Sequence, residues 1–215
     1  MITLESIKEL LGCRVSDIAA VRLPEPFLGL DYAVSFCIKL SDAVVDGIEN
    51  APTHTYFHHY RTVNRALDDA VQLCGELLQR EGYTFLPIAA SQSVNNGTDG
   101  FSGVYSHKQA AVYCGMGYVG INNLFIHKKF GPSVRLATLF TDCPLSEIFG
   151  EKLKKEDYTK CLSCRECIKN CPAGAITEQG FDPQACSSFM KKAYQHIGRG
   201  VVCGKCMYVC RAQHK

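Results

Sequence analysis

Cysteine is the residue type whose spacing carries the most chemistry in this sequence. Cys161, Cys164, Cys167 and Cys171 follow the pattern Cys-x2-Cys-x2-Cys-x3-Cys, and Pro172 comes directly after the last of them. In such a run the first three thiolates hold one iron–sulfur cubane, while the fourth ligates a second cubane. The spacing therefore predicts iron–sulfur clusters, bound by cysteines from more than one part of the chain.

A second and looser run of cysteines supplies the remaining ligands: Cys186, Cys203, Cys206 and Cys210. Two-cluster pairing assigns the first [4Fe–4S] cluster to Cys161, Cys164, Cys167 and Cys210. It assigns the second [4Fe–4S] cluster to Cys171, Cys186, Cys203 and Cys206. The eight thiolates together predict two clusters.

Zinc and disulfides are the alternatives to clusters. Structural zinc also uses Cys-x2-Cys pairs, but it takes four tetrahedral ligands, and a third cysteine at x2 followed by a fourth at x3 before proline fits it poorly. A disulfide framework needs an oxidising compartment. Residues 1–12 alternate charge with Leu and Ile at helical spacing and do not resemble a signal peptide. We therefore expect a reducing cytoplasm, and an anaerobic host suits oxygen-sensitive clusters.

Composition describes an ordinary globular protein. The chain has 215 residues, of which 47% are hydrophobic, and a formal net charge of +2. This charge gives no reason to expect binding to nucleic acid, and no apolar run approaches the roughly 20 residues of a membrane span. We expect residues 1–150 to form one domain with its own core and residues 151–215 to form a small cluster module.

Hydrophobic periodicity divides residues 1–150 into helices and strands. Helices are expected at 4–11, 55–81 and 106–115, and strands at 18–23, 31–40, 83–89, 124–127 and 134–141. The strand at 18–23 should end at Pro24, and the long helix carries a continuous apolar stripe before Gly82. Because helices and strands alternate, the fold class is α/β or α+β.

Gly115, Gly117 and Gly120 form the pattern Gly-x-Gly-x-x-Gly. A dinucleotide site needs this pattern between a strand and the N-terminus of a helix, which binds the pyrophosphate. Here the pattern follows an expected helix and leads into an expected strand. We interpret the glycines as positions where the backbone packs closely, against a flat cofactor for example, rather than as a nicotinamide site.

The histidines and the other cysteines give weaker signals. His54 and His58 stand four residues apart, as a metal-binding pair would, but no glutamate completes the zinc motif, so we interpret them as surface or core-edge residues. Cys143 precedes a proline and is interpreted as a buried thiol. We place the remaining cysteines in the core: Cys13, Cys37, Cys74 and Cys114.

Residues 107–120, residues 130–145 and the cysteine block together resemble epoxyqueuosine reductase, which is itself similar to the catalytic core of corrinoid reductive dehalogenases. The resemblance covers about half of the chain. It implies a nitroreductase-like α/β domain that holds a cobalamin, followed by a ferredoxin-like module that delivers electrons to cobalt. In this interpretation Gly115, Gly117, Gly120 and Asn122 bind the cofactor.

The sequence departs from that family at the proton donor. The family carries an Asp-Ser-x-Pro stretch whose aspartate donates a proton, whereas residues 100–107 lack it here and only Asp99 lies nearby. We expect Tyr105 or His107 to replace this acid, beside Asp99. A substrate other than epoxyqueuosine follows from the same departure.

Three functions stay open. The first is a reductase that passes electrons from its clusters to a corrinoid, with flavin as the second choice of cofactor. The alternative is an electron-transfer protein that reduces a partner, such as a corrinoid protein, without its own substrate. The third is a module whose clusters serve as structure or as a redox sensor. The first two need an electron donor of ferredoxin or flavodoxin type, and a reductase also needs a small-molecule substrate.

Overall fold

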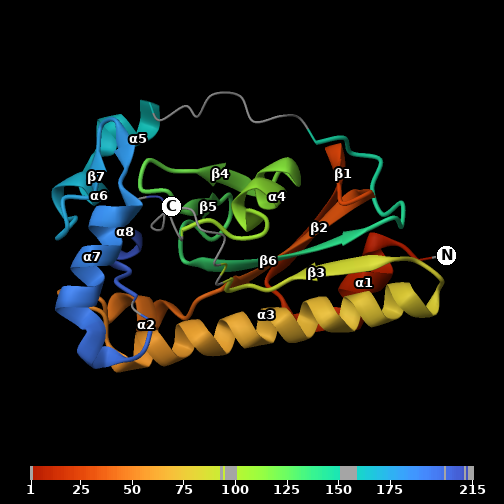
Figure 1. Ribbon diagram of the computed structural model, residues 1–215, viewed down its shortest axis with the longest axis horizontal. Helices are drawn as coiled ribbons and strands as arrows, with labels where there is room; N and C mark the ends of the chain where they lie inside the picture. The colour runs from red at the N-terminus through yellow and green to blue at the C-terminus, as the bar shows by residue number, and fades with distance from the viewer. Residues whose placement is uncertain are drawn as a thin grey trace. The chain divides into compact units, whose positions relative to one another are not determined.

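The structure is a computed structural model that describes residues 2–92, 94, 101–150, 159–200, 202–210 and 212 (Figure 1). It divides into two compact units, each assembled from separate segments. The first unit comprises Met1–Ile38, Val63–Gly117 and Arg135–Lys154, and the second comprises Lys39–Thr62, Tyr118–Val134 and Lys155–Lys215. The division into domains at residue 150 stays a prediction. The mixed α/β class expected from the sequence is confirmed.

A four-stranded sheet forms the centre of the first unit. Its strands are β1 (Asp17–Phe27), β2 (Leu30–Lys39), β3 (Phe85–Ile88) and β6 (Val134–Thr141), in the order β1-β2-β6-β3. β1 pairs antiparallel with β2, with Ala20 opposite Val34, and β3 pairs antiparallel with β6, with Leu86 opposite Phe140. Residues on both faces of β2 are buried, as its alternating apolar pattern predicts.

β1 is longer than the sequence predicts, because it does not end at Pro24. Its register with β2 is interrupted between Arg22 and Phe27, and the prolines lie in this irregular section. There the backbone of Arg22 pairs with residues 148–150 instead: its N–H donates to the Ile148 carbonyl, and its carbonyl accepts from Gly150, both at 2.8 Å. β1 is an edge strand of the sheet. Proline is tolerated there because its missing N–H can face away from the neighbouring strand, where no hydrogen bond is needed.

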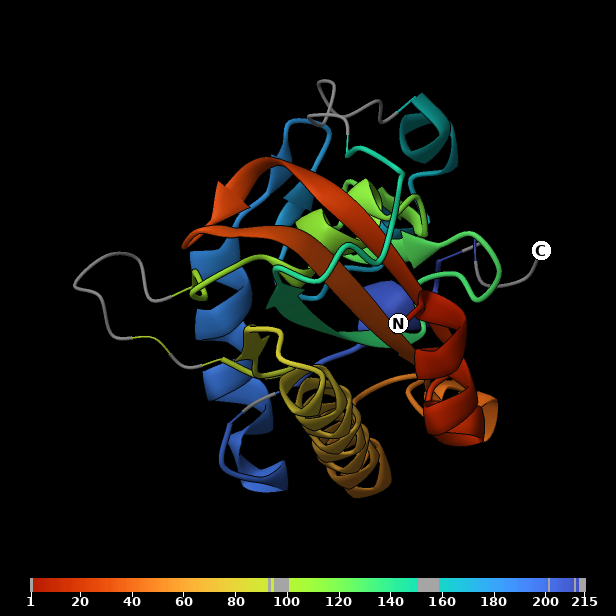
Figure 2. The same ribbon diagram turned by 90° about the vertical axis from the view of Figure 1, so that its right-hand side faces the viewer.

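Helices cover both faces of this sheet. Helix α3 (His54–Arg80) lies along one face and α4 (His107–Tyr113) along the other, as both views show (Figure 2). The apolar stripe of α3 is buried as predicted except at Tyr60, which is half-buried. Gly75 allows close contact with the sheet, because a Cβ there would meet the Phe85 ring at 2.3 Å. Helix α1 (Leu4–Leu11) begins at a capping box between Thr3 and Ser6.

Phe140 occupies the centre of the core of the first unit. Its side chain is fully buried, and its ring centroid lies 4.6 Å from that of Phe27 and 4.7 Å from that of Tyr105. We expect Phe140→Ala to lower the free energy of unfolding by about 3–5 kcal/mol, through lost burial and a cavity. Anaerobic thermal unfolding measures this effect. Phe149→Ala makes the same change at a side chain that is 58% exposed, and equal shifts for the two variants would contradict the prediction.

The second unit consists of short elements. It contains α2 (Asp42–Asp46), β5 (Phe125–His127) and most of β4 (Gly117–Val119), followed by the cysteine-bearing segments. Those segments form α5 (Thr159–Cys164), α6 (Glu166–Lys169), the β7–β8 hairpin (Ile176–Thr177 and Gly180–Phe181), α7 (Pro183–Tyr194), the 3-10 turn η2 (Gln195–Ile197) and α8 (Lys205–Tyr208). Such short elements have little apolar surface of their own, so their positions depend on neighbouring segments.

One of the four core assignments for cysteine is wrong. Cys13 is exposed, because it lies in the 3-10 turn η1 (Gly12–Arg14), beyond the buried positions Ile7 and Leu11 of α1. Cys37, Cys74 and Cys143 are buried, and Cys114 is half-buried. No helix within the described ranges is long and apolar enough to cross a membrane.

Candidate metal centre

Four thiols come together at the start of the cysteine block. Cys161 and Cys164 lie on α5, Cys167 lies on α6, and Cys210 follows α8. Burial raises the pKa of the Cys167 thiol to about 11, and repulsion from thiolates at Cys210, Cys161 and Cys164 adds to the rise. Helix α6 packs against α8, which agrees with a location of the four thiols in one part of the second unit. They are the four assigned to the first cluster, and their ligation of iron stays a prediction.

Arg165 shapes the loop between the first three of these cysteines. It adopts the left-handed conformation with a φ of 57°, which ends α5 and begins α6. Its Nε donates to the Leu162 carbonyl at 3.0 Å, and its guanidinium lies 2.6 Å from the Glu178 carboxylate. The turn breaks the helical path, so Cys167 need not follow the helical spacing of Cys161 and Cys164.

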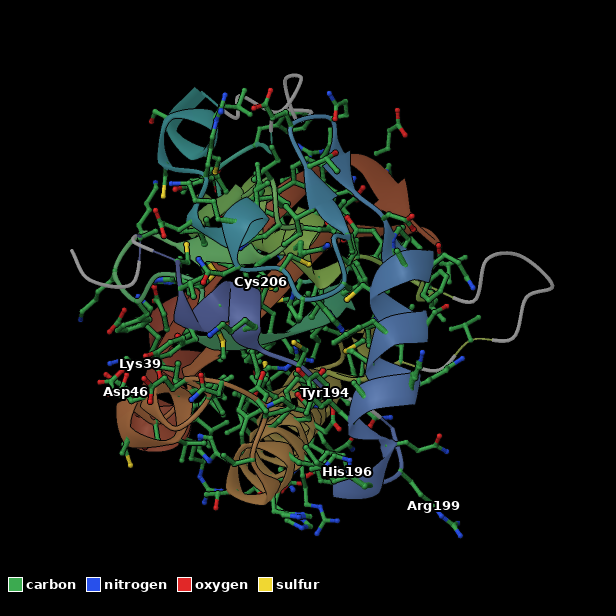
Figure 3. The ribbon with its side chains drawn as sticks, turned by 90° about the vertical axis from the view of Figure 1, so that its left-hand side faces the viewer. Lys39, Asp46, Tyr194, His196, Arg199 and Cys206 are labelled. Atoms are coloured by element: carbon green, nitrogen blue, oxygen red, sulfur yellow. The ribbon has the colours of Figure 1, made fainter. Side chains whose placement is uncertain are left out.

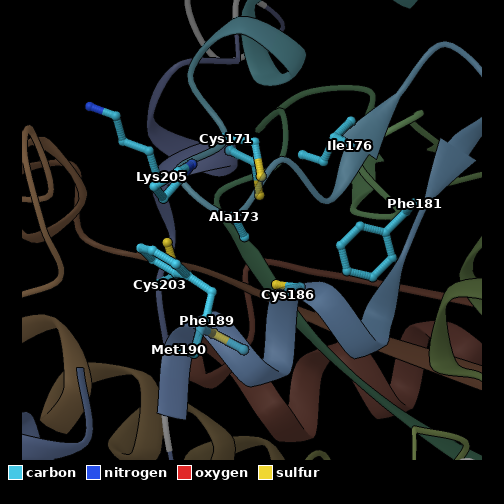
Figure 4. Close-up of a pocket in the computed structure, with 11 residues that line it drawn as sticks. Cys171, Ala173, Ile176, Phe181, Cys186, Phe189, Met190, Cys203 and Lys205 are labelled. Carbon is cyan, nitrogen blue, oxygen red and sulfur yellow. The ribbon is translucent and has the colours of Figure 1, made fainter. Parts of the chain in front are cut away.

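The other four cysteines surround a cavity (Figure 4). Cys171, Cys186 and Cys203 direct their sulfur atoms toward a common space, and Cys206 completes the set. Burial raises the pKa of Cys186 to about 11, and nearby thiolates at Cys203 and Cys171 contribute. The rest of the wall is largely apolar and includes Ile176, Phe181, Phe189 and Met190.

The cavity wall and the four thiols fit a [4Fe–4S] cluster. Such a cluster takes four thiolates, and an apolar shell around it limits the access of water. Within the described ranges, no three His, Cys, Asp or Glu side chains meet closely enough to hold a single metal ion. A cubane does not require such convergence, because its iron and sulfide core separates the four thiolates. The pKa of Cys206 is raised by burial and, in addition, by thiolates of both groups, among them Cys203 and Cys167.

The loop between Cys203 and Cys206 is held from three sides within the second unit. Gly204 has a φ of +74°, and a Cβ there would lie 2.9 Å from Ile48 and 3.0 Å from Tyr56. The Lys205 ammonium donates to the Glu49 carbonyl, and the Asn122 amide donates to the Cys206 carbonyl at 3.4 Å. Residues 48–56 and 122 therefore position ligands that lie about 80 to 150 residues later in the sequence.

The residues predicted to donate a proton lie in the first unit. Tyr105 packs edge-on against Phe27, and its pKa is raised to about 12, chiefly by burial. His107 is fixed through both ring nitrogens: Nε2 lies 2.8 Å from the Ala89 carbonyl, and Nδ1 lies 2.9 Å from the Thr138 hydroxyl. Asp99 lies outside the described residues. The catalytic roles of these three residues stay predictions.

Replacing His107 tests its role in the fold. Burial lowers the pKa of His107 from its ordinary value of 6.5, so the neutral ring donates to Ala89 and accepts from Thr138, whose side chain is fully buried. His107→Ala leaves Thr138 unpaired, and we expect the free energy of unfolding to fall by about 1–3 kcal/mol.

The same substitution changes the pH dependence of stability. A histidine with a lowered pKa binds fewer protons folded than unfolded, so the parent should lose stability as the pH falls below 6.5, and His107→Ala should lose less. Anaerobic thermal unfolding between pH 5 and 8 measures both effects. His54→Ala, at an exposed histidine, should retain the parental profile; identical profiles for the parent and His107→Ala would refute the prediction.

The glycine segment has structural roles that the geometry makes plain. Gly115 follows α4 with a φ of +68°, and Gly117 begins β4. A Cβ at Gly120 would meet the Asn122 side chain and Ile126 at 2.8 Å. Asn122 is buried, and its Oδ1 accepts from the Leu124 N–H at 3.2 Å. Binding of a cofactor by these four residues stays a prediction.

Sequence reasoning missed Tyr118, which lies inside the glycine pattern. Its side chain is 41% exposed, and its pKa is raised by burial first and then by thiolates at Cys161 and Cys210. Tyr118 is therefore close to the first group of thiols. An aromatic residue between two glycines of the pattern was the available signal, but its proximity to cysteines more than 40 positions away needed the folded chain.

Comparisons with known proteins agree with this site. Residues 155–177 match a family model described as a 4Fe-4S binding domain. The chain is 30% identical over 116 residues to the tetrachloroethene reductive dehalogenase of Dehalobacter restrictus, covering 46% of this chain and 21% of that protein. It is 29% identical over 119 residues to the epoxyqueuosine reductase of Listeria monocytogenes, covering 51% of this chain and 30% of that protein. The resemblance seen in the sequence is confirmed.

Solved structures show the same fold. A catabolic reductive dehalogenase superposes with a TM-score of 0.76 at 18% identity, over 98% of this chain and 31% of that one. An epoxyqueuosine reductase in complex with a tRNA stem loop superposes with a TM-score of 0.63 at 17% identity, over 98% of this chain and 65% of that one. The chain therefore spans less than a third of the dehalogenase and about two thirds of the epoxyqueuosine reductase. Its fold is shared with both, and it contains a 4Fe–4S binding motif.

Proposed function

We propose that this chain is an iron–sulfur oxidoreductase that holds two [4Fe–4S] clusters and passes their electrons to a cofactor. One observation carries the proposal: Cys171, Cys186, Cys203 and Cys206 line one cavity, and the other four thiols lie on or beside α5, α6 and α8 of the same unit, where α6 packs against α8. Neighbouring clusters can exchange electrons, whereas isolated structural metal sites have no need of such proximity. Eight reduced thiols also suit a cytoplasmic location.

The cofactor that we propose is a corrinoid, held by a nitroreductase-like domain within residues 1–150. A solved reductive dehalogenase whose title describes B12-dependent dehalogenation has a TM-score of 0.75 to this chain, at 18% identity. A bound corrinoid supplies a cobalt centre that accepts single electrons and reacts with the substrate. Gly115, Gly117 and Gly120 have no side chains of their own that would keep a cofactor from the backbone, and Asn122 links this segment to Cys206.

Tyr118 connects the glycine segment with the first group of thiols within the second unit. It lies in the glycine segment assigned to the cofactor and is influenced by Cys161 and Cys210, which are ligands of the first cluster. Asn122 of the same segment donates to the Cys206 carbonyl, so the segment adjoins ligands proposed for both clusters. The Tyr105 hydroxyl, whose pKa is about 12, stays protonated at neutral pH and is the stronger candidate for proton donation.

One observation favours the alternative of an electron-transfer protein that reduces a partner. Both ring nitrogens of His107 are occupied by groups of its own unit, so this histidine is poorly placed to exchange a proton with a substrate. A carrier needs no proton donor, while a reductase whose substrate takes up protons does.

An anaerobic purification with metal analysis tests the proposal. Two clusters require about eight iron and eight sulfide per chain, and a titration with cobalamin followed by absorption should then change the cobalt spectrum. Zinc in place of iron would refute the cluster assignment. Full clusters without uptake of cobalamin or flavin would refute the reductase and leave the electron-transfer protein.

A further inference from the structure

Helix α7 has one face toward the second group of thiols and another toward solvent. Cys186, Phe189 and Met190 line the cavity, and their spacing of three and four residues places them on the same side of the helix. Lys191 and Lys192 follow them and are exposed. A helix is only about 10 Å across, so these ammonium groups lie about one helix diameter from the cavity.

The exposed side of α7 and the turn after it is strongly basic. Residues 183–200 contain no Asp or Glu. Within this segment Lys191, Lys192, His196 and Arg199 are exposed, and we call these four residues the basic α7 face. His196 and Arg199 follow the C-terminal end of α7, and Arg199 extends outward (Figure 3).

In the part of the chain that the structure describes, the cations of this face have no carboxylate partner, unlike three other cations of the same unit. Lys39 lies 2.6 Å from Asp42, Arg165 lies 2.6 Å from Glu178, and Lys169 lies 3.4 Å from Glu166. Among the described residues, neither Lys191, Lys192 nor Arg199 forms an ion pair. The dipole of α7 favours lysine in its last turn, but it does not account for Arg199, which lies beyond the helix, or for the lack of acidic residues.

We propose that the basic α7 face is the docking surface for a small acidic electron-carrier protein of the ferredoxin class, and that electrons enter the chain there. This inference rests on the proposed function, because it requires a cluster at Cys171, Cys186, Cys203 and Cys206. In the transfer, the reduced carrier loses one electron and the oxidised second cluster gains it. No bond or proton changes place.

Charge and position together favour a protein carrier over RNA, the other polyanion that a basic surface can bind. A carrier must bring its own redox centre close to a cluster, and Lys191 and Lys192 directly follow Phe189 and Met190, which line the cluster cavity. RNA binding has no such requirement. Complementary charge also accelerates encounter between proteins, with an effect that decreases as salt is added.

The double substitution K191E/K192E tests the docking surface in the cluster-loaded protein. The probe is a purified bacterial ferredoxin of net negative charge, reduced beforehand and mixed with the oxidised protein in an anaerobic stopped-flow instrument. At low ionic strength we expect the second-order rate constant for cluster reduction to fall at least about tenfold, and its dependence on salt to become weaker. Iron content and the EPR signal after chemical reduction should match the parent protein.

K128E/K129E is the matched control. It also reverses two adjacent exposed lysines of the second unit, but in the turn between β5 and β6. Its rate constant should stay within about twofold of the parent value. Equal slowing of both variants, or of neither, would overturn the docking surface. So would a loss of binding to an RNA stem-loop by K191E/K192E without slower reduction by ferredoxin. Parent protein with far fewer than about eight iron atoms would instead refute the proposed function.

Discussion

Cys186→Ala is expected to remove one cluster and to leave the other. Cys186 is the only one of the eight cysteines on α7, and its thiol faces Cys171 and Cys203 across the cavity that these residues line. Without it three thiolates remain, and iron and sulfide should fall from about eight to about four per chain. The EPR spectrum of the reduced protein should change from that of two interacting clusters to that of one.

Cys164→Ala should give the complementary result, with the first cluster lost and the second retained. Cys74→Ala is the matched control, because it also replaces a cysteine side chain by a methyl group. Cys74 lies in the first unit, fully buried on α3. It should retain all the iron. Retention of eight iron atoms by Cys186→Ala would show that this residue is not a ligand, and zinc in the parent protein would refute both assignments.

Local patterns predicted the elements that depend on local interactions. The helix expected at 55–81 is α3, His54–Arg80, because a stripe of apolar residues over seven turns leaves no other way to bury them. Ser106 was expected to begin a helix, and its hydroxyl accepts from the Gln109 N–H at the start of α4. In both cases the residues that determine the structure lie within a few positions of one another.

Predictions that depended on distant segments were incomplete. The extension of β1 combines a local pairing of Phe27 with Leu30 and hydrogen bonds between Arg22 and residues 148–150, which no periodicity connects to Arg22. Tyr118 and Asn122 lie near the cysteines only because the β4–β5 hairpin and the cluster loops pack together within the second unit. Cysteine spacing identified the eight candidate ligands, because metal chemistry restricts spacing strongly, but it gave no information about the side chains that hold them in place.

Gly204→Ala is expected to remove the second cluster although it changes no ligand. Gly204 lies between Cys203 and Lys205 with a φ of +74°, where a side chain costs about 1–3 kcal/mol. Its new Cβ would also lie 2.9 Å from Ile48 and 3.0 Å from Tyr56, which are both buried. The Cys203–Cys206 loop must then shift, and two of four thiolates leave their positions. Iron should fall toward about four per chain.

Gly200→Ala distinguishes the effect of backbone strain from the effect of the contacts with Ile48 and Tyr56. Gly200 has a similar φ of +79°, but nothing lies within 4 Å of a new Cβ there. An alanine at residue 200 has a similarly unfavourable backbone conformation, four residues before Gly204, but makes no new contact. This variant should keep both clusters. Loss of iron in both variants would mean that backbone strain alone weakens the site, and retention in both would mean that the loop tolerates displacement. Loss in Gly204→Ala alone would show that Ile48 and Tyr56, which precede the cysteine block by about 100 residues, hold the second cluster in place.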